Sequence, residues 1–245
     1  MIMVPSIDVE RGIAVKRVGG VKGTGFKLGD PLKIGIKLWE MGARIIHIID
    51  LDGAERGEPV NLWLVKQLKS EVGDDLVVQF GGGIRTVESA LKVYWNGADI
   101  LVVGTAWTEN PSILEEISDI GIYALAAVDV KAGRVAVRGW KEVTKLDLDE
   151  AFRLLEPFKI YGYLVTCIDV EGRSTGACLP LAAQARSLTR KIIEYAGGVK
   201  DEADLKTLAS IGVDATIVGM SFYLGELGNK PIFWYGDTSL KVKRL

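Results

Sequence analysis

The stretch VVQFGGGIRTVESALKVYWNGADILVVGTAWTENP, residues 77–111, decides the fold of this chain. It contains an apolar run, the glycine cluster 81–83, a helical stretch, a second apolar run, and Gly104-Thr105 where another helix starts. Glycines after a strand let backbone N–H groups approach an anion closely, and a helix N-terminus adds the positive end of its dipole. The stretch therefore predicts a phosphate cradle built from two successive strand-to-helix turns.

The same pattern occurs again at an offset of 115 residues, which holds from 82 to 197 and from 103 to 218. Both glycine turns, and the helix between them, therefore have a second copy. Other segments recur as well: Ile7-Asp8-Val9 returns as Val128-Asp129-Val130, and Ile49-Asp50-Leu51-Asp52-Gly53 returns as Ile168-Asp169-Val170-Glu171-Gly172. The chain is accordingly interpreted as two copies of one half.

Composition restricts the class of protein. The chain has 245 residues, of which 48% are hydrophobic and 25% charged, as in soluble globular proteins. A net charge of −2 and the lack of basic blocks argue against nucleic acid or an anionic membrane as partners. No apolar run reaches the ~18 residues of a membrane span, and no signal peptide is visible. Two cysteines, Cys167 and Cys178, are then expected as free thiols in a cytoplasmic protein.

Apolar strands alternate with helices along the whole chain, which predicts a parallel sheet buried on both faces. Eight such units in two equal halves favour a closed (β/α)8 TIM barrel built from two duplicated half-barrels, with residues 1–245 as a single domain. Besides the two apolar runs of the central stretch, the expected strands are 1–8, 44–50, 122–129, 163–168, 191–195 and 214–218. The main helices expected outside that stretch are 30–41, 61–71, 147–156, 180–189 and 201–210.

Three segments depart from this regular alternation. Residues 19–29 carry five glycines and are predicted to be a mobile loop, and 132–144 is predicted as a second loop. The stretch 220–224 is expected to be a small phosphate-binding helix. Residues 225–245 form an atypical tail without a standard eighth helix, whose aromatic side chains are expected to pack and whose basic end is expected in solvent. An interface role is the alternative for this tail.

The expected active site lies at the carboxyl ends of the strands. Asp8 and Asp129 end strands one and five, so they face each other across the barrel mouth, and the two glycine cradles also oppose each other. This arrangement predicts an elongated ligand with a phosphate at each end and its reacting centre between two carboxyl groups. Such a pair can serve as general acid and general base. The alternative is that both aspartates only cap loops or balance local cations.

The motifs at these positions resemble the family of histidine-biosynthesis isomerases, from about residue 2 to residue 225. They are VPSID, HIIDLDGAERGEPVN, GGGIR, VVGTAWTENP, VDV followed by RGW, TCIDVEG, and AGGV followed by IVGMSFY. The resemblance implies an Amadori rearrangement, aldose to ketose, of the phosphoribosyl-formimino-aminoimidazole-carboxamide ribonucleotide. It implies a substrate with two phosphates, no cofactor and no metal. A monomer without nucleic-acid or membrane partners is expected.

The resemblance also implies roles for individual residues. Asp8 is implied as the base, Asp129 as the acid, and Thr166 as an aid at the sugar. A loop tryptophan, Trp140, is implied to stack on the imidazole of the substrate, and its loop is expected to close over that ring; a packing role is the alternative. His47 is either a substrate contact or a satisfied core residue, with neither preferred. The remaining implied binding residues are Lys16, Gly83, Arg85, Gly104, Thr105, Arg138, Gly176, Gly198 and Gly219.

The chain also departs from the family pattern. Lys16 replaces a usual arginine, Glu171 a usual aspartate, Cys167 an acidic residue, and Glu194-Tyr195-Ala196 a smaller stretch. These departures affect the second phosphate site and the hydrogen bonds of strand six. Three alternatives stay open: the cyclase subunit of imidazole glycerol phosphate synthase, a dual-substrate isomerase that also rearranges phosphoribosyl anthranilate, and a non-catalytic protein that retains the fold.

Overall fold

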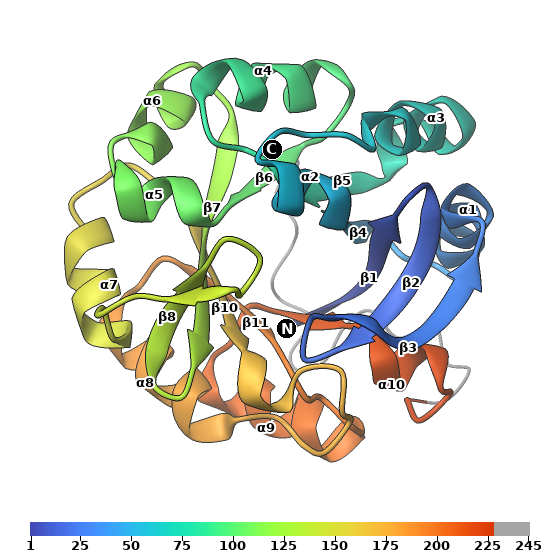
Figure 1. The fold of residues 1–245 in the computed structure, drawn as a ribbon. Helices are drawn as coiled ribbons and strands as arrows, with labels where there is room; N and C mark the ends of the chain where they lie inside the picture. The colour runs from blue at the N-terminus through green and yellow to red at the C-terminus, as the bar shows by residue number, and fades with distance from the viewer. Residues whose placement is uncertain (228–245) are drawn as a thin grey trace.

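Eight parallel strands follow one another in chain order around a closed barrel (Figure 1). The barrel closes because the fifth and sixth of these strands, β7 and β10, pair in parallel. The predicted (β/α)8 barrel is therefore confirmed. The computed structural model describes residues 1–227. The barrel strands are β1 (Ile2–Glu10), β4 (Ile45–Asp50), β5 (Val77–Gly81), β6 (Ile100–Val103), β7 (Tyr123–Lys131), β10 (Gly162–Cys167), β11 (Ile192–Ala196) and β12 (Ala215–Val218).

Helices surround the barrel, and their starts follow local capping chemistry. The Asp30 side chain accepts hydrogen bonds from the backbone N–H groups of Leu32 and Lys33, and Pro31 occupies the first turn, where a missing N–H costs nothing. Thr86 and Asp147 begin their helices with complete capping boxes. The helices are α1 (Pro31–Glu40), α2 (Leu51–Arg56), α3 (Leu62–Val72), α4 (Val87–Trp95), α5 (Thr105–Glu109), α6 (Ile113–Asp119), α7 (Leu148–Leu155), α8 (Leu179–Leu188), α9 (Glu202–Ile211) and α10 (Met220–Tyr223), with 3-10 turns at Gly73–Asp75 and Ile168–Val170.

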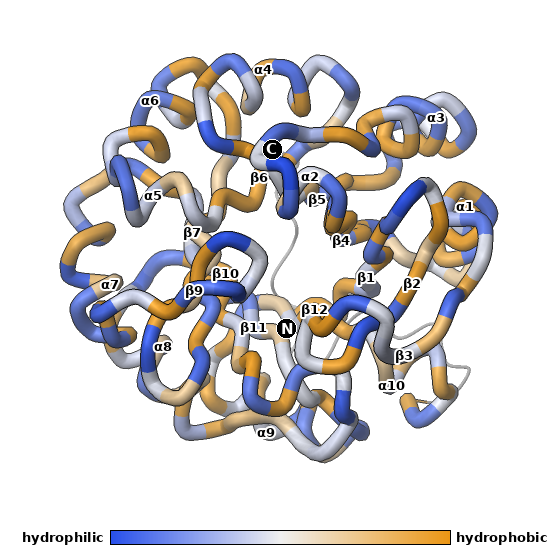
Figure 2. The backbone as a smooth tube through the Cα atoms, viewed as in Figure 1, coloured by the Kyte–Doolittle hydropathy of each residue, from blue (hydrophilic) through white to orange (hydrophobic). Residues whose placement is uncertain are grey.

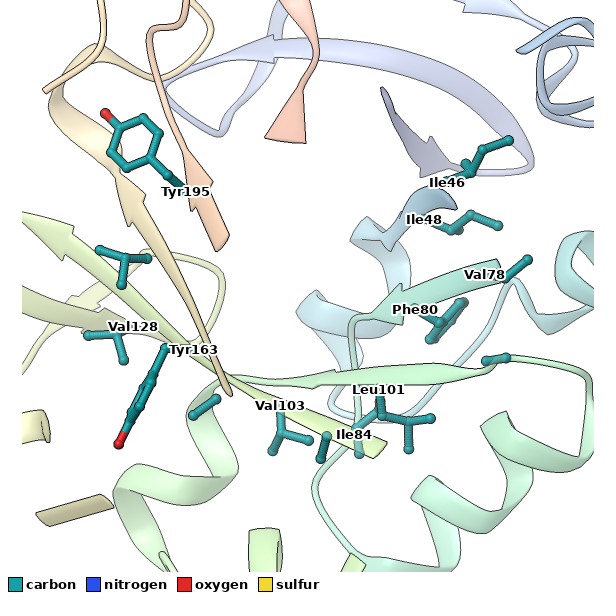
Figure 3. Close-up of a cluster of buried hydrophobic side chains, with 14 of the residues drawn as sticks. Ile46, Ile48, Val78, Phe80, Ile84, Leu101, Val103, Val128, Tyr163 and Tyr195 are labelled. Carbon is teal, nitrogen blue, oxygen red and sulfur yellow. The ribbon is translucent and has the colours of Figure 1, made fainter. Parts of the chain in front are cut away.

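Two apolar layers stabilise the barrel. The larger lies between strands and helices, where side chains such as Ile46, Phe80 and Tyr163 point away from the barrel axis (Figure 3). The smaller fills the barrel interior below the strand ends and includes Val4 and Leu125. Hydropathy along the backbone shows the same division, since the strands are mainly apolar and polar residues gather on the outer helices and loops (Figure 2). Burial on both faces explains why these strands read as continuous apolar runs.

The predicted mobile loop at 19–29 is wrong. Most of it is a strand, β3 (Val21–Gly29), which pairs antiparallel with β2 (Ile13–Val18) and so extends β1 into a three-stranded ribbon. Gly23 and Gly25 have positive φ, and the pairing shifts register nearby, as in a bulged strand. Because nearly every β3 side chain is exposed, no hydrophobic alternation marks the strand in the sequence.

The second predicted loop, 132–144, is also wrong in part. It contains β8 (Arg134–Val137) and β9 (Glu142–Val143), with β8 pairing to both β7 and β9. These strands are short and partly exposed, and because glycine and charged residues interrupt them, the sequence shows no apolar strand pattern there. The small helix expected at 220–224 is present as α10. The aromatic and basic parts of the predicted tail lie in 228–245, outside the described residues. Over residues 1–227, no helix is long and apolar enough to cross a membrane.

Candidate active site

A cavity of about 670 Å³ opens at the carboxyl ends of the barrel strands, a volume suited to a small-molecule ligand. It is lined by loops from both halves of the chain, and by the ribbon β2–β3 and the loop that follows β8. The predicted site residues Lys16 and Gly176 do not line it. The others all do: Asp8, His47, Gly83, Arg85, Gly104, Thr105, Asp129, Arg138, Trp140, Thr166, Gly198 and Gly219.

Asp8 lies at the end of β1 and is paired with a buried cation. The Lys16 ammonium group, on the neighbouring strand β2, donates to Asp8 Oδ1 at 2.9 Å and to Ser6 Oγ at 2.6 Å. A Cβ added to Gly219 would lie 2.7 Å from Lys16 Nζ, so the lysine sits directly against the second glycine cradle. Lys16 is thus behind the cavity wall, where it links the carboxylate of Asp8 to the cradle at Gly219.

Asp129 lies on β7, four strands from β1 in the closed order and therefore on the opposite side of the barrel. Its register partner on β10 is Thr166, whose side chain hydrogen-bonds the carboxyl group. The indole Nε1 of Trp140 donates to Asp129 Oδ2 at 2.8 Å. Burial raises the pKa of Asp129, and the hydrogen bonds from Thr166 and Trp140 offset only part of this shift. A carboxyl group in this environment holds its proton to higher pH, as a general acid requires.

Trp140 packs between the two sides of the cavity mouth. Its ring lies against Gly20 of the β2–β3 ribbon, so close that a Cβ on Gly20 would reach it. Arg138, Gly139 and Trp140 all have positive φ, an uncommon run for non-glycine residues. This backbone turn directs the indole toward Asp129, which places the N–H edge of the ring beside the acid.

The first cradle follows β5 and β6. Gly83 has a φ of +80°, and a Cβ there would lie 2.4 Å from the backbone of Glu58, so only glycine fits. Gly104 begins α5 with open space around it, the nearest atom to an added Cβ being Ala127 Cβ at 3.8 Å. Thr105 Oγ1 accepts from the backbone N–H of Arg138 at 2.8 Å. This bond joins the first cradle to the Trp140 loop.

Arg85 and Arg138 differ in how they are held. The Arg85 guanidinium lies against Gly57, where an added Cβ would be 2.5 Å from Arg85 Cζ. Arg138 is exposed and pairs with Glu109 at 3.2 Å. Exposed pairs of this kind contribute little to stability, roughly 0–1 kcal/mol. Both cations therefore stay available to a phosphate at the first cradle.

The second cradle follows β11 and β12. Gly198 has a φ of +71°, and a Cβ there would lie 2.4 Å from the carbonyl oxygen of Gly176. The Gly176 N–H in turn donates to the Gly198 carbonyl at 2.9 Å. Gly176 thus supports the cradle from behind instead of lining it. Gly219 stands at the N-terminus of α10, beside Lys16.

His47 combines the two interpretations left open by the sequence. It is only 3% exposed and hydrogen-bonds Gln79, as a core histidine would, yet its ring also lines the cavity near Asp8. Burial lowers the pKa of His47 to about 4, with Asp8 and Gln79 opposing the shift. The imidazole is therefore neutral near pH 7.

Three charged residues that line the cavity, Glu171, Arg17 and Glu55, were not among the predicted site residues. Glu171 lines the cavity, and burial raises its pKa to about 7, an effect that Lys16 reduces and that Asp8 and Asp129 reinforce. In the internal repeat Glu171 corresponds to Asp52, and this correspondence was the sequence signal that could have identified it. Arg17 and Glu55, which also line the cavity, form an ion pair at 3.2 Å, and nothing in the sequence pattern marks it. Within residues 1–227, no cluster of three or more His, Cys, Asp or Glu side chains is placed to hold a metal ion.

Replacing Trp140 by Phe should change the pH profile as well as binding. Without the indole N–H, the charged form of Asp129 loses a hydrogen bond, so its pKa should rise further and the alkaline limb of kcat should move to higher pH. The smaller ring should raise KM by several-fold, since a stacked aromatic contact contributes roughly 0.5–1.5 kcal/mol. Unchanged kinetics with a lowered melting temperature would instead make Trp140 a packing residue.

The repeated cradles lead to an expectation for simple anions. A crystal grown in phosphate should show two bound anions on the same face, one at Gly83 and Gly104, the other at Gly198 and Gly219. Arg85→Ala should weaken only the first, because Arg85 follows Gly83 in that cradle. Density at neither position would contradict the cradle interpretation.

Comparisons with known proteins agree with this geometry. The sequence-family model described as "Histidine biosynthesis protein" matches residues 2–228. A relative from Natronomonas pharaonis is 37% identical over 225 residues, covering 91% of this chain and 93% of the relative. Relatives from Methanosphaera stadtmanae and Saccharolobus solfataricus are 36% and 35% identical over 230 residues, covering 92% of this chain and 95% and 96% of their own lengths. All three are named 1-(5-phosphoribosyl)-5-((5-phosphoribosylamino)methylideneamino)imidazole-4-carboxamide isomerase.

Proposed function

This chain belongs to the family of histidine biosynthesis proteins, and on that basis we propose that it is the isomerase for which its relatives are named. The reaction is an Amadori rearrangement that converts the ribosylamine of a bis-phosphorylated ribonucleotide from aldose to ketose. One observation carries the proposal: Asp8 and Asp129 stand on opposite sides of one cavity, in unlike environments, between two glycine cradles.

The residues divide the chemistry between them. Asp129, whose pKa is raised by burial, gives its proton to the ring oxygen of the ribose as the bond between that oxygen and C1 breaks. The lone pair of the nitrogen bonded to C1 forms a C=N bond, so the opened sugar is an iminium ion. Asp8, as carboxylate, then removes the proton from C2, and the electron pair forms an enolamine. A proton is then returned to C1 while the C2 hydroxyl gives up its own proton, so that C2 becomes the carbonyl of the ketose.

Phosphates at the two cradles would orient the substrate along the line between them. Backbone N–H groups after glycine turns suit a phosphate, and Arg85 and Lys16 supply charge at either end. Trp140 would then lie beside Asp129 and close to the heterocycle. We propose that the chain acts as a monomer, since the acid, the base and both cradles lie within residues 1–227 of one chain. Its two free thiols support a cytoplasmic location.

The cyclase alternative would require ammonia to reach the cavity through the barrel. The barrel interior is closed by a buried apolar cluster and, above it, by a hydrogen bond of 2.7 Å between Gln79 and Glu194 from opposite strands. This packing favours the isomerase. The dual-substrate alternative shares the same acid and base, so only a substrate assay separates the two.

The test uses the purified full chain with the bis-phosphorylated ribonucleotide, with and without added ammonia, and separately with phosphoribosyl anthranilate. We expect conversion to the ketose without ammonia and no cyclised product when ammonia is added. Ammonia-dependent cyclisation would replace the proposal with the cyclase. Absence of turnover, combined with tight substrate binding, would favour a non-catalytic protein.

A further inference from the structure

Three buried polar side chains form a chain of hydrogen bonds across the barrel, directly below the cavity. His47 on β4 has its Nδ1 at 3.3 Å from Gln79 Oε1, and Gln79 Nε2 on β5 donates to Glu194 Oε1 on β11 at 2.7 Å. All three are at most 3% exposed. β5 and β11 are opposite strands, and positions 79 and 194 are 115 residues apart, the offset of the repeat. The bond thus joins equivalent positions of the two halves.

The direction of this chain is set at its Glu194 end. Gln79 Nε2 donates to Glu194 Oε1 at 2.7 Å, so the amide turns its NH2 group toward Glu194. The carbonyl oxygen of the same amide then faces His47. An amide oxygen cannot donate, so the hydrogen between Gln79 and His47 must be carried by His47 Nδ1.

The neutral imidazole of His47 carries only one ring proton, so the bond to Gln79 determines which nitrogen is protonated. Burial lowers the pKa of His47 to about 4, so the imidazole is neutral near pH 7 and carries one N–H. If that proton is on Nδ1, then Nε2 has only a lone pair. Since Nδ1 is engaged by Gln79 and the ring lines the cavity, Nε2 is the ring nitrogen available to a ligand.

We propose that Glu194 is a positioning residue that acts through Gln79 to hold His47 in its Nδ1–H tautomer, so that the ring presents an acceptor to the cavity. The group that such an acceptor takes is a hydroxyl of the sugar phosphate. This last step rests on the proposed function, whereas the tautomer does not.

Packing alone does not explain a glutamate at position 194, because burying an ionisable side chain costs stability. Glu194 Oε2 has no hydrogen-bond partner among residues 1–227, and burial raises the pKa of this side chain to about 7. Well-packed apolar residues are often as stable as, or more stable than, buried ionisable groups. The neighbouring inward positions on β11 and β10, Ala196 and Leu164, are apolar members of the inner cluster. The carboxyl group is therefore best explained by what it does to Gln79.

The tautomer can be observed directly because the chain has one histidine. Protein labelled with ¹⁵N and carrying no histidine tag would be examined without substrate by long-range ¹H–¹⁵N correlation at neutral pH. We expect a protonated, pyrrole-type Nδ1 and an unprotonated, pyridine-type Nε2. The reverse assignment would overturn the proposal whether or not the chain is the isomerase.

Variants test whether Glu194 is the cause. In Glu194→Leu, Gln79 loses its fixed orientation, so we expect the Nε2–H form to become populated. Gln79→Leu should give the same change, and the double variant no more. Ile193→Ala is the matched control: its fully buried side chain belongs to the outer core, so it should lower stability and leave the tautomer unchanged. An unchanged Nδ1–H signal in Glu194→Leu would overturn the proposal.

Kinetics give the second readout. Loss of the acceptor at Nε2 should raise KM roughly tenfold, the usual effect of one hydrogen bond, with a smaller effect on kcat. Ile193→Ala should keep the wild-type KM. A tautomer shift without any change in KM would remove the hydroxyl contact and leave the positioning role of Glu194 standing.

Discussion

Asp129→Asn and Asp8→Asn are each expected to lower kcat by roughly 10²–10⁴-fold, the range that a positioned general acid or base contributes. Both changes keep the size of the side chain, so the barrel should stay folded and the substrate should still bind through its two phosphates. Asp129 can still accept from Trp140 as an asparagine, which keeps the loop in place. The measurement is single-turnover kinetics together with a binding titration.

The pH dependence of kcat should be a bell with assignable limbs. Asp8 must be ionised, so activity falls at the acid side as Asp8 gains a proton. Asp129 must be protonated, so activity is present below its pKa and is lost as pH rises through it. Because burial raises that pKa, the alkaline limb lies above the range of an ordinary carboxyl group. Residual activity should lose its acid limb in Asp8→Asn and its alkaline limb in Asp129→Asn.

Glu171 provides the control, since it titrates in the same cavity with a pKa of about 7. Glu171→Gln should keep both limbs if Asp129 is the acid. Disappearance of the alkaline limb in Glu171→Gln would transfer the acid role to Glu171. If Asp8→Asn lost the alkaline limb and Asp129→Asn the acid limb, the two aspartates would have exchanged roles. Near-normal turnover in either variant would show that the altered residue takes no part in the chemistry.

Lys16→Met should have the largest effect on stability. It removes the one ion-pair partner that Asp8 has among residues 1–227 and leaves a mostly buried carboxylate without a cation. Breaking a buried pair costs roughly 3–5 kcal/mol, and we expect about 2–3 kcal/mol here because the Asp8 side chain is 13% exposed. The free energy of unfolding, measured by urea denaturation at pH 7, tests this. Activity should also fall, since the base is then harder to keep ionised.

A second lysine on the same ribbon gives the matched control. Lys22 pairs with Glu55 at 2.8 Å, but its side chain is 49% exposed, so Lys22→Met should cost less than about 1 kcal/mol. In Asp8→Asn, further replacement of Lys16 should cost far less than in the wild type, because the two effects act through one pair. Additive losses in the double variant would show that Lys16 stabilises the ribbon independently of Asp8.

The barrel could be predicted from local signals. The apolar runs and the capped helices depend on residues close together in sequence, the repeat relates positions 115 residues apart, and all three point to the same fold. The positions of Asp8 and Asp129 follow from that fold, because parallel strands put their ends at one face. The strand β3 was missed because exposed strands lack the alternation that marks a half-buried one.

The sequence by itself thus determined the parallel barrel, its two halves, the opposed aspartates and the glycine turns, since strand order and periodicity place them without knowledge of side-chain contacts. Only the tertiary structure decided that Lys16 pairs with Asp8 behind the cavity wall, that Trp140 donates to Asp129, and that Gln79 meets Glu194 across the barrel. The first two contacts depend on how the chain folds back after β1 and after β7. The third joins residues 115 apart, and it depends on how closure and stagger of the barrel bring inward-facing side chains to the same height.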